Sequence, residues 1–267
     1  MTNYYSEKVS LKTITLEKVL TAGDSKRKRK IILIEGVAGA GKTTLSCHIC
    51  NRWAACDLFQ NIRLLIHISL SNSDIHSAQN LADIIPHYSE SIKHSVADAI
   101  AKTSGKHICF ILDACDEAPP SFWQSFLQRF IAGTGKLRLP NATIILCSRP
   151  GMRIECRQYL TGKIVVKGFS SDSLNKFIED RFQGNTRDKI QLTDALEMKP
   201  ELQSLCYLPL NAAILLFLYN FLKEDLPTTR TGLFHPLVCN CLIHHIYTRT
   251  TKTVSYTHLT LPTIYSV

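Results

Sequence analysis

Short apolar runs alternate with longer segments of helical periodicity from residue 30 onward. The runs at 108–112 and 144–146 are apolar without alternation, as is typical of central strands in a parallel sheet. Strands that alternate with helices predict an α/β fold with a mostly parallel sheet flanked by helices. The predicted strands are Ile31–Glu35, Arg63–Leu70, His107–Asp113, Thr143–Ser148 and Lys163–Val166. The predicted helices between them are Thr44–Cys56, Asn80–Lys102 and Pro120–Ile131.

The pattern changes after residue 168, where helical segments follow one another without a strand between them. We expect helices at Ser171–Phe182, Asp188–Met198, Pro209–Lys223 and Leu233–Thr248. The predicted domains are a leader with a basic run at 1–29, the α/β domain at 30–168, a small helical domain at 169–226 and a further region at 227–253.

One uncharged stretch, Leu205–Leu222, approaches the length of a membrane-spanning helix. It contains Pro209, Asn211 and Asn220, and no basic flank lies close before it. We expect a buried helix here and no contact with a membrane, with a membrane span as the alternative.

Composition excludes wholesale disorder, because 45% of the residues are hydrophobic and 20% are charged. The net charge is +9, and part of it comes from the run Lys26–Lys30. This run is either a solvated linker or a patch for nuclear import or an anionic surface. Basic and aromatic residues do not interleave as they do in proteins that stack on bases, so nucleic acid is not the expected partner.

Ten cysteines are spread along the chain, several of them inside apolar runs. The start, Met1 to Lys12, is polar and does not resemble a signal peptide. Reduced thiols in a cytoplasmic protein fit this pattern best. A zinc site built from Cys239, Cys241, His244 and His245 is an alternative, although no partner pair occurs at finger spacing.

The last residues, 254–267, shift abruptly to threonine, serine and tyrosine. They resemble a translated sequencing adapter, so we expect them to be non-native. The natural chain is then expected to continue past residue 253.

A glycine-rich segment directly follows the first predicted strand and opens the first predicted helix. This layout is typical of a phosphate-binding loop, in which glycines allow backbone N–H groups to approach an anion. The lysine would reach the β- and γ-phosphates of ATP or ADP, and the threonine hydroxyl would bind Mg²⁺. The predicted nucleotide-binding residues are Gly36, Gly39, Ala40, Gly41, Lys42, Thr43 and Thr44.

Acidic residues follow the strand that ends at Asp113. This carboxylate stands at the end of an apolar strand, so we expect it to hold Mg²⁺ together with Thr43. Asp116 and Glu117 form a second acidic pair, and one of them would orient the attacking water. We favour Glu117 for this role and place Asp116 in support of the metal.

Arg149 follows the strand at 143–148 and precedes a proline. An arginine at this edge of the sheet can sense the γ-phosphate through charge-assisted hydrogen bonds. An ordinary surface arginine is the alternative.

The order of these motifs resembles a NACHT domain, the nucleotide-binding module of NOD-like receptors in the STAND class of P-loop NTPases. The resemblance rests on GVAGAGKTT at 36–44, LDACDE at 112–117, LPNATIILCSRP at 139–150, VVKGFS at 165–170 and LCYLPL at 205–210. It implies that Pro209 borders the adenine and that 227–253 begins a winged-helix region. It also implies that a signalling adaptor binds through an effector domain missing from this sequence, and that the full-length protein self-associates. Ala114 stands where the family often has glycine.

The sequence therefore supports a switch in which exchange of ADP for ATP and slow hydrolysis control self-association, in innate-immune or cell-death signalling. A nucleic-acid-stimulated P-loop ATPase is a second hypothesis, motivated by the basic run and the net charge. A nucleotide-binding scaffold that does not hydrolyse ATP is a third.

Overall fold

The computed structural model describes residues 29–85, 89–151, 154–182, 185–222, 226, 229, 231–236 and 238–239. The chain divides into two compact units, Met1–Gly168 and Phe169–Val267. The predicted border at residue 168 coincides with this division.

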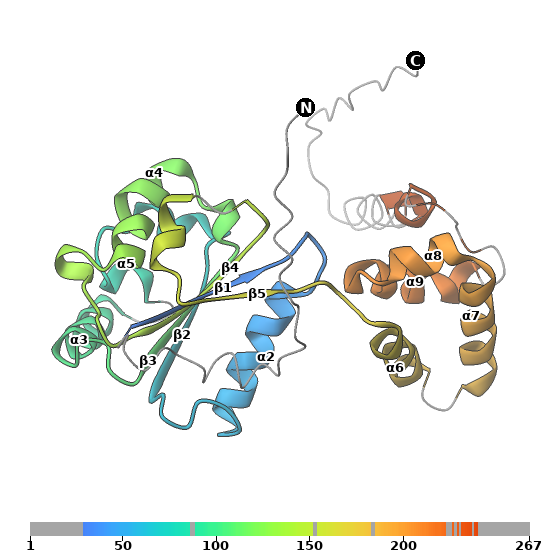
Figure 1. The fold of residues 1–267 in the computed structure, drawn as a ribbon, viewed down its shortest axis with the longest axis horizontal. Coiled ribbons are helices and arrows are strands. Elements are labelled where there is room, and N and C mark those ends of the chain that lie inside the picture. Colours follow the sequence, from blue (N-terminus) through green and yellow to red (C-terminus); the bar gives the residue numbers. More distant parts are fainter. Residues whose placement is uncertain are drawn as a thin grey trace, which may run out of the picture. The chain divides into compact units, whose positions relative to one another are not determined.

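The first unit contains a five-stranded sheet in the order β2-β3-β4-β1-β5 (Figure 1). Every neighbouring pair of strands is parallel. The strands are β1 (Lys30–Glu35), β2 (Leu64–Ser69), β3 (Ile108–Asp113), β4 (Thr143–Ser148) and β5 (Gly162–Val165). All five agree with the predicted runs to within one residue at either end, and the predicted α/β fold is confirmed. Because β1 lies between β4 and β5, its carboxyl end lies inside the sheet, where doubly wound folds bind ligands.

Helices cover both faces of the sheet (Figure 1). Alternate residues of β1 point to opposite faces, so Ile31 and Leu33 enter one core cluster while Ile32 and Ile34 enter another. Ile49 of helix α2 (Lys42–Ala54) packs into the second cluster. The first cluster receives helix α3 (Glu90–Lys102) and four phenylalanines that stack or meet edge-on, Phe110, Phe122, Phe126 and Phe130.

The predicted helix at Asn80–Lys102 is wrong in its first half. Helix α3 begins only at Glu90 and ends at Lys102. Ile85 is extended, with φ −81° and ψ 116°, because the following Pro86 disfavours helical geometry in the residue before it. Ser89, which caps α3, is extended as well.

The predicted helix at Pro120–Ile131 is found, but its middle is widened. It consists of α4 (Pro120–Phe122), a π-helical segment (Trp123–Leu127) and α5 (Gln128–Ala132). Gly133 ends it in a left-handed conformation, with φ 69°. Short 3₁₀ segments lie at Ser73–Ser77, Ala82–Ile84, Cys115–Glu117, Gly135–Leu137 and Ile154–Tyr159.

The second unit is helical and has its own apolar core. Its helices are α6 (Ser171–Arg181), α7 (Thr186–Met198), α8 (Pro200–Cys206) and α9 (Pro209–Leu222). The sequence reading missed α8, a helix of seven residues whose start is marked by Pro200 at its first position. Residues 231–236 and 238–239 are helical, so this helix starts two residues before the predicted range Leu233–Thr248.

The uncharged stretch at 205–222 is divided between α8 and α9. Asn211 is buried, and its side-chain amide donates to the Leu205 carbonyl at 2.9 Å. Within the described residues, no single helix has both the length and the apolar character to cross a membrane; only α8 and α9 taken together do, and they are bent by 118°. Residues 1–28 of the predicted leader, the tail at 254–267, and Cys241, His244 and His245 lie outside the described residues.

Candidate functional site

The glycine-rich segment forms the connection between β1 and α2. Gly39 and Gly41 have φ of 78° and 96°, which side-chain-bearing residues rarely adopt. At Gly36 the reason for glycine is space, because an added Cβ would lie 2.7 Å from the Val166 carbonyl oxygen. Ala40 is buried beneath the loop. The sequence of this loop is therefore fixed by its backbone path.

The loop leaves backbone donors free at the start of α2. The N–H groups of residues 41–44 donate to no acceptor in the described part of the chain. No side chain caps this helix, and its first turn holds no acidic residue. A helix N-terminus with free N–H groups carries a partial positive charge and binds anions. The first turn also presents the side chains of Thr43 and Thr44, both exposed.

Lys42 bends over this loop. Its ammonium donates to the carbonyl oxygens of Gly36 at 2.8 Å and Val37 at 3.1 Å. An ammonium has three N–H donors, so one stays available to an anion above the loop. The lysine thus adds a full positive charge to the partial charge of the helix.

A pair of residues beneath the loop was not predicted. Ser46 is fully buried, and its hydroxyl donates to the Thr43 carbonyl at 2.8 Å. The same hydroxyl lies 3.1 Å from Nε2 of His67, on β2. These contacts tie the first turn of α2 to the sheet. The only sequence signal was a lone histidine inside the apolar strand at 64–69.

Asp113 ends β3 and is 3% exposed. Its backbone carbonyl accepts from Leu70, which continues from β2. The Cys147 thiol, near the end of β4, lies close to the Asp113 carboxylate. The pKa of this thiol is raised to about 12, first by burial and then by the charge of Asp113, while Lys42 acts in the opposite direction. Asp113 and Lys42 therefore both lie near one buried thiol. Asp113 and Thr43 form no direct hydrogen bond with each other.

Arg149 joins both other acids. Its backbone N–H donates to Oδ1 of Asp116 at 2.9 Å, and its Nε lies 3.1 Å from Oδ2. Its Nη2 lies 3.4 Å from Oε1 of Glu117. The structure thus brings these three predicted residues together at the carboxyl ends of β3 and β4. The side chain of Arg149 is 53% exposed, so these ion pairs contribute little to stability and can be exchanged for other partners.

Ala114 adopts a left-handed conformation, with φ 57° and ψ 44°, directly after Asp113. This conformation costs a residue with a Cβ about 1–2 kcal/mol, whereas glycine gives back about 0.4–1 kcal/mol through its freer unfolded chain. We expect Ala114→Gly to stabilise the protein by up to about 1 kcal/mol, or about 2–4 °C in Tm. Ala99→Gly, on an exposed helical position, should instead destabilise by about 1 kcal/mol. Thermal unfolding of both variants tests this difference in stability. If both variants lose the same amount of stability, the expectation for Ala114 is contradicted.

A second unpredicted pair lies at the start of the loop. Glu35 is buried at the end of β1, and its Oε2 lies 2.6 Å from Nζ of Lys163 on β5. The Glu35 carbonyl also accepts from Val166 at 2.7 Å. This pair fixes the edge strand beside Gly36. Pro209 begins α9 in the second unit, and its contact with adenine stays a prediction.

The residues at this edge of the sheet fit a magnesium nucleotide in their chemistry. Free N–H groups and a lysine suit phosphate oxygens. An exposed threonine hydroxyl and a carboxylate suit Mg²⁺, which prefers oxygen ligands. Among the described residues there is no group of three or more His, Cys, Asp or Glu side chains that could hold a metal ion by themselves.

Comparison with known protein families finds a match to the NACHT domain over residues 30–185. This range covers the whole sheet and reaches the end of α6.

Two curated relatives have similar sequences. The NACHT, LRR and PYD domains-containing protein 3 of Bos taurus is 25% identical over 199 residues, which cover 67% of this chain and 19% of that protein. Protein NLRC5 of Homo sapiens is 24% identical over 207 residues, 74% of this chain and 11% of that protein. The chain spans about a fifth or less of the length of these relatives.

Among solved structures, a Walker-type ATPase of Pyrococcus abyssi is 14% identical, with a TM-score of 0.47. The match covers 85% of this chain and 71% of that one.

Proposed function

This chain belongs to the NACHT domain family of P-loop nucleotide-binding proteins, and from that premise we propose that it is an ATP- and ADP-binding signalling switch. Exchange of ADP for ATP, and slow hydrolysis, would control self-association of the full-length protein. The length of the curated relatives leaves room for an effector domain that binds a signalling adaptor and for further domains. We place this activity in the cytoplasm, in innate-immune or cell-death signalling.

The observation that carries the proposal is the set of free N–H groups at residues 41–44, together with the ammonium of Lys42 held against the same loop. In the proposed complex these groups bind the phosphates of ATP or ADP. The Thr43 hydroxyl and the Asp113 carboxylate hold Mg²⁺, which supplies charge neutralisation when bound. Gly36, Gly39 and Gly41 keep side chains away from the phosphates.

Arg149 and Glu117 distinguish the two nucleotides in this proposal. Arg149 pairs with Asp116 and Glu117, and its exposed side chain is free to turn toward a γ-phosphate. That exchange would release Glu117, which then accepts a hydrogen bond from the attacking water and orients it. The same movement of Arg149 would therefore signal that ATP is bound and release Glu117, the residue that promotes ATP hydrolysis. A switch of this kind shifts only by the difference in affinity between its two states.

Glu117→Gln tests turnover and switching together. We expect hydrolysis to fall about 10²–10³-fold, because an amide cannot act as a base, while ATP still binds. The ATP-bound form then accumulates, and sedimentation should show more association of this variant with ATP than of the wild type. Hydrolysis is measured as phosphate release. Glu90→Gln, an exposed position on α3, serves as the control and should change neither result.

Unchanged hydrolysis in Glu117→Gln would instead favour the scaffold that binds nucleotide without turnover. Unchanged association in the presence of ATP, for both proteins, would oppose the switch.

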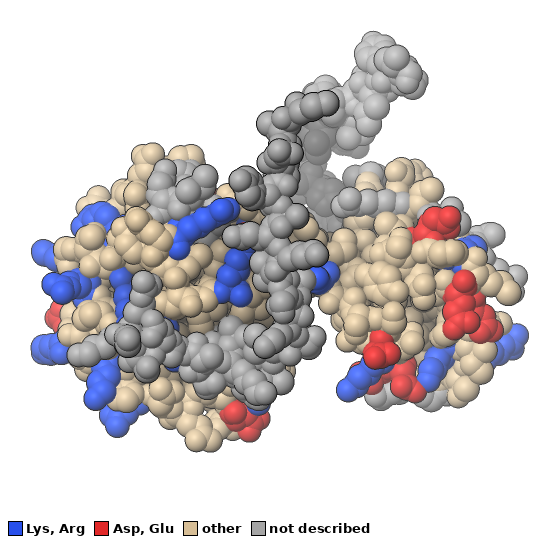
Figure 2. Space-filling model, in the orientation of Figure 1, with Lys and Arg blue, Asp and Glu red and all other residues tan. Residues whose placement is uncertain are grey.

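The nucleic-acid-stimulated ATPase has less support. On the face shown in Figure 2, lysine and arginine side chains of the first unit lie at separate places among uncharged residues. A backbone-binding track instead gathers them along one path. Steep loss of RNA or DNA binding with rising salt, together with stimulated hydrolysis, would reverse this preference.

A further inference from the structure

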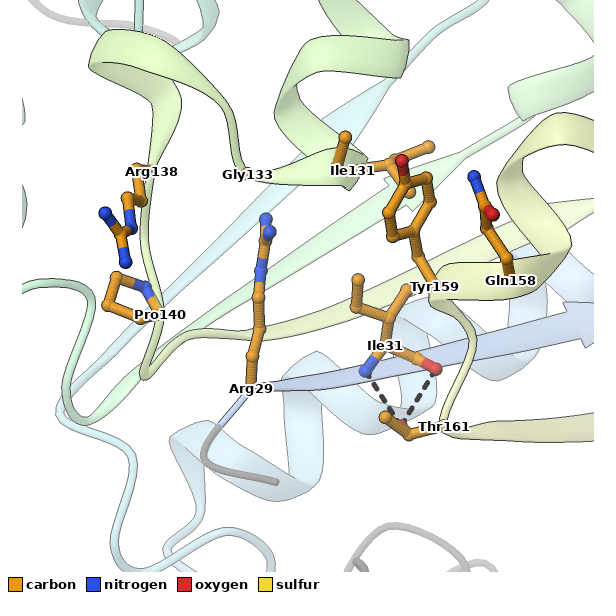
Figure 3. A pocket seen from close by; sticks show the side chains of 10 residues that line it. Arg29, Ile31, Ile131, Gly133, Arg138, Pro140, Gln158, Tyr159 and Thr161 are labelled. Atoms are coloured by element: carbon orange, nitrogen blue, oxygen red, sulfur yellow. Dashed lines mark hydrogen bonds between the residues drawn. The ribbon is translucent and has the colours of Figure 1, made fainter. Parts of the chain in front are cut away.

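A pocket of about 450 Å³ lies at the amino ends of the strands, whereas the phosphate loop lies at their carboxyl ends. It is formed where β1, β4 and β5 begin, together with the turn that follows α5 (Figure 3). Its volume is in the range of small-molecule sites. The lining residues are Arg29, Ile31, Ile131, Ala132, Gly133, Arg138, Pro140, Gln158, Tyr159 and Thr161.

Arg29 is the main polar group of this pocket. Its side chain extends toward Gly133 (Figure 3), and Nη2 donates to the Phe130 carbonyl. Its Nε is buried and has no hydrogen-bond partner. Burial lowers the pKa of the guanidinium, and no carboxylate among the described residues forms an ion pair with it. Arg29 as a whole is half-buried, and a charge partly withdrawn from water without a counter-charge is unfavourable, so this position is favourable for an anion.

Further donors stand around Arg29. Arg138 lies on one side of it, and Gln158 and Tyr159 lie on the other (Figure 3). Within the described part of the chain these three side chains make no hydrogen bond or ion pair. Thr161 is different, because its single O–H donor is used by the Ile31 carbonyl, while its oxygen accepts from the Ile31 N–H.

Apolar side chains complete the walls. Ile31 and Ile131 are buried, and Pro140 lies beside Arg138. A pocket with apolar walls and a few convergent polar groups is the usual form of a site for a small organic ligand. Guanidinium groups match the planar geometry of carboxylate and the oxygens of phosphate.

We propose that this pocket binds a small organic anion, with its carboxylate or phosphate group between Arg29 and Arg138 and its apolar part against Ile31, Ile131 and the ring of Tyr159. The site is independent of the nucleotide. β1 runs from Arg29 to the phosphate loop, and six strand residues at about 3.3 Å each separate the two sites by about 20 Å. The proposal therefore does not rest on the proposed function.

The direct test is NMR of the arginine Nε–H signals of the full chain, titrated with succinate and, separately, with inorganic phosphate. Arg29→Gln assigns the signal of Arg29. We expect this signal to shift with at least one of the two anions, and the stronger of the two identifies carboxylate or phosphate as the preferred group. Because phosphate also fits the loop at 36–43, the titration is repeated in Lys42→Ala, where the Arg29 shift should persist.

Arg138→Gln provides the affinity test, since this exposed residue has no partner to lose within the described structure. Losing one charge-assisted hydrogen bond should weaken anion binding about tenfold. Arg63→Gln, an exposed arginine directly before β2 and outside the pocket, should leave the affinity unchanged. The proposal is overturned if the Arg29 signal moves with neither anion, or if Arg138→Gln and Arg63→Gln bind as the wild type does.

Discussion

Lys42→Ala is expected to lower the affinity for Mg²⁺-ATP about a hundredfold. Lys42 brings a full positive charge to the loop, where its ammonium lies against the carbonyl oxygens of Gly36 and Val37. A hydrogen bond to a charged group contributes about 1.5–3 kcal/mol, and 2.7 kcal/mol corresponds to about a factor of one hundred.

The measurement is thermal unfolding with nucleotide. At a concentration of about 1,000 times the wild-type Kd, ATP adds about 4 kcal/mol of stability, whereas at 10 times the Kd of the variant it adds about 1.4 kcal/mol. The nucleotide-induced rise in Tm should therefore shrink by about 5–10 °C. Lys106→Ala, an exposed lysine before β3, is the control and should keep the full rise. If Lys42→Ala keeps it as well, the loop at 36–43 is not the nucleotide site.

The sheet could be predicted from sequence because its signal is local. Runs such as Ile31–Ile34 and Ile108–Leu112 place apolar side chains on both faces of a strand. A parallel strand in a sheet covered by helices on both sides buries both sets of side chains. The helix at 80–102 was placed wrongly because Pro86 acts on the residue before it, against the periodicity of the whole segment. A single backbone restriction here outweighed a pattern of many side chains.

The candidate site also has a part that could be predicted from the sequence and a part that could not. The phosphate loop was predictable because its backbone path requires glycine at fixed positions, and glycines are visible in the sequence. Gly39 and Gly41 have positive φ, and at Gly36 a side chain would collide with Val166. Contacts between segments that are distant in the sequence could not be predicted, because the order of residues does not reveal which side chains meet. Ser46 with His67, Glu35 with Lys163 and Asp113 with Cys147 are all of this second kind.

Ala114 shows how a local departure can be read once its backbone is known. The sequence alone does not show how much free energy an alanine costs at position 114, where the family often has glycine. The left-handed φ of 57° shows that this alanine is held in an unfavourable conformation between Asp113 and the acidic pair. Strain of this kind persists only where the surroundings fix the backbone, and it is common at functional sites.

Asp113→Asn is expected to abolish the effect of Mg²⁺ on ATP binding and to reduce hydrolysis at least about a hundredfold. An amide has nearly the same shape as the carboxylate, so the fold should be kept. It has no negative charge, and Mg²⁺ in such sites is held through one or two carboxylates. ATP affinity is measured with Mg²⁺ and with EDTA. The wild type should lose affinity in EDTA, whereas the variant should bind equally in both.

A second readout separates the position of Asp113 from its role with the metal. The negative charge of Asp113 disfavours the thiolate of Cys147 and so helps to raise the pKa of that thiol to about 12. In Asp113→Asn this pKa should fall, although burial keeps it above the ordinary value of 9.0. Asp98→Asn, on the exposed side of α3, should change neither the thiol nor the magnesium effect. If the thiol pKa falls while Mg²⁺ still strengthens ATP binding, Asp113 lies where the structure places it but does not hold the metal, and Asp116 becomes the next candidate.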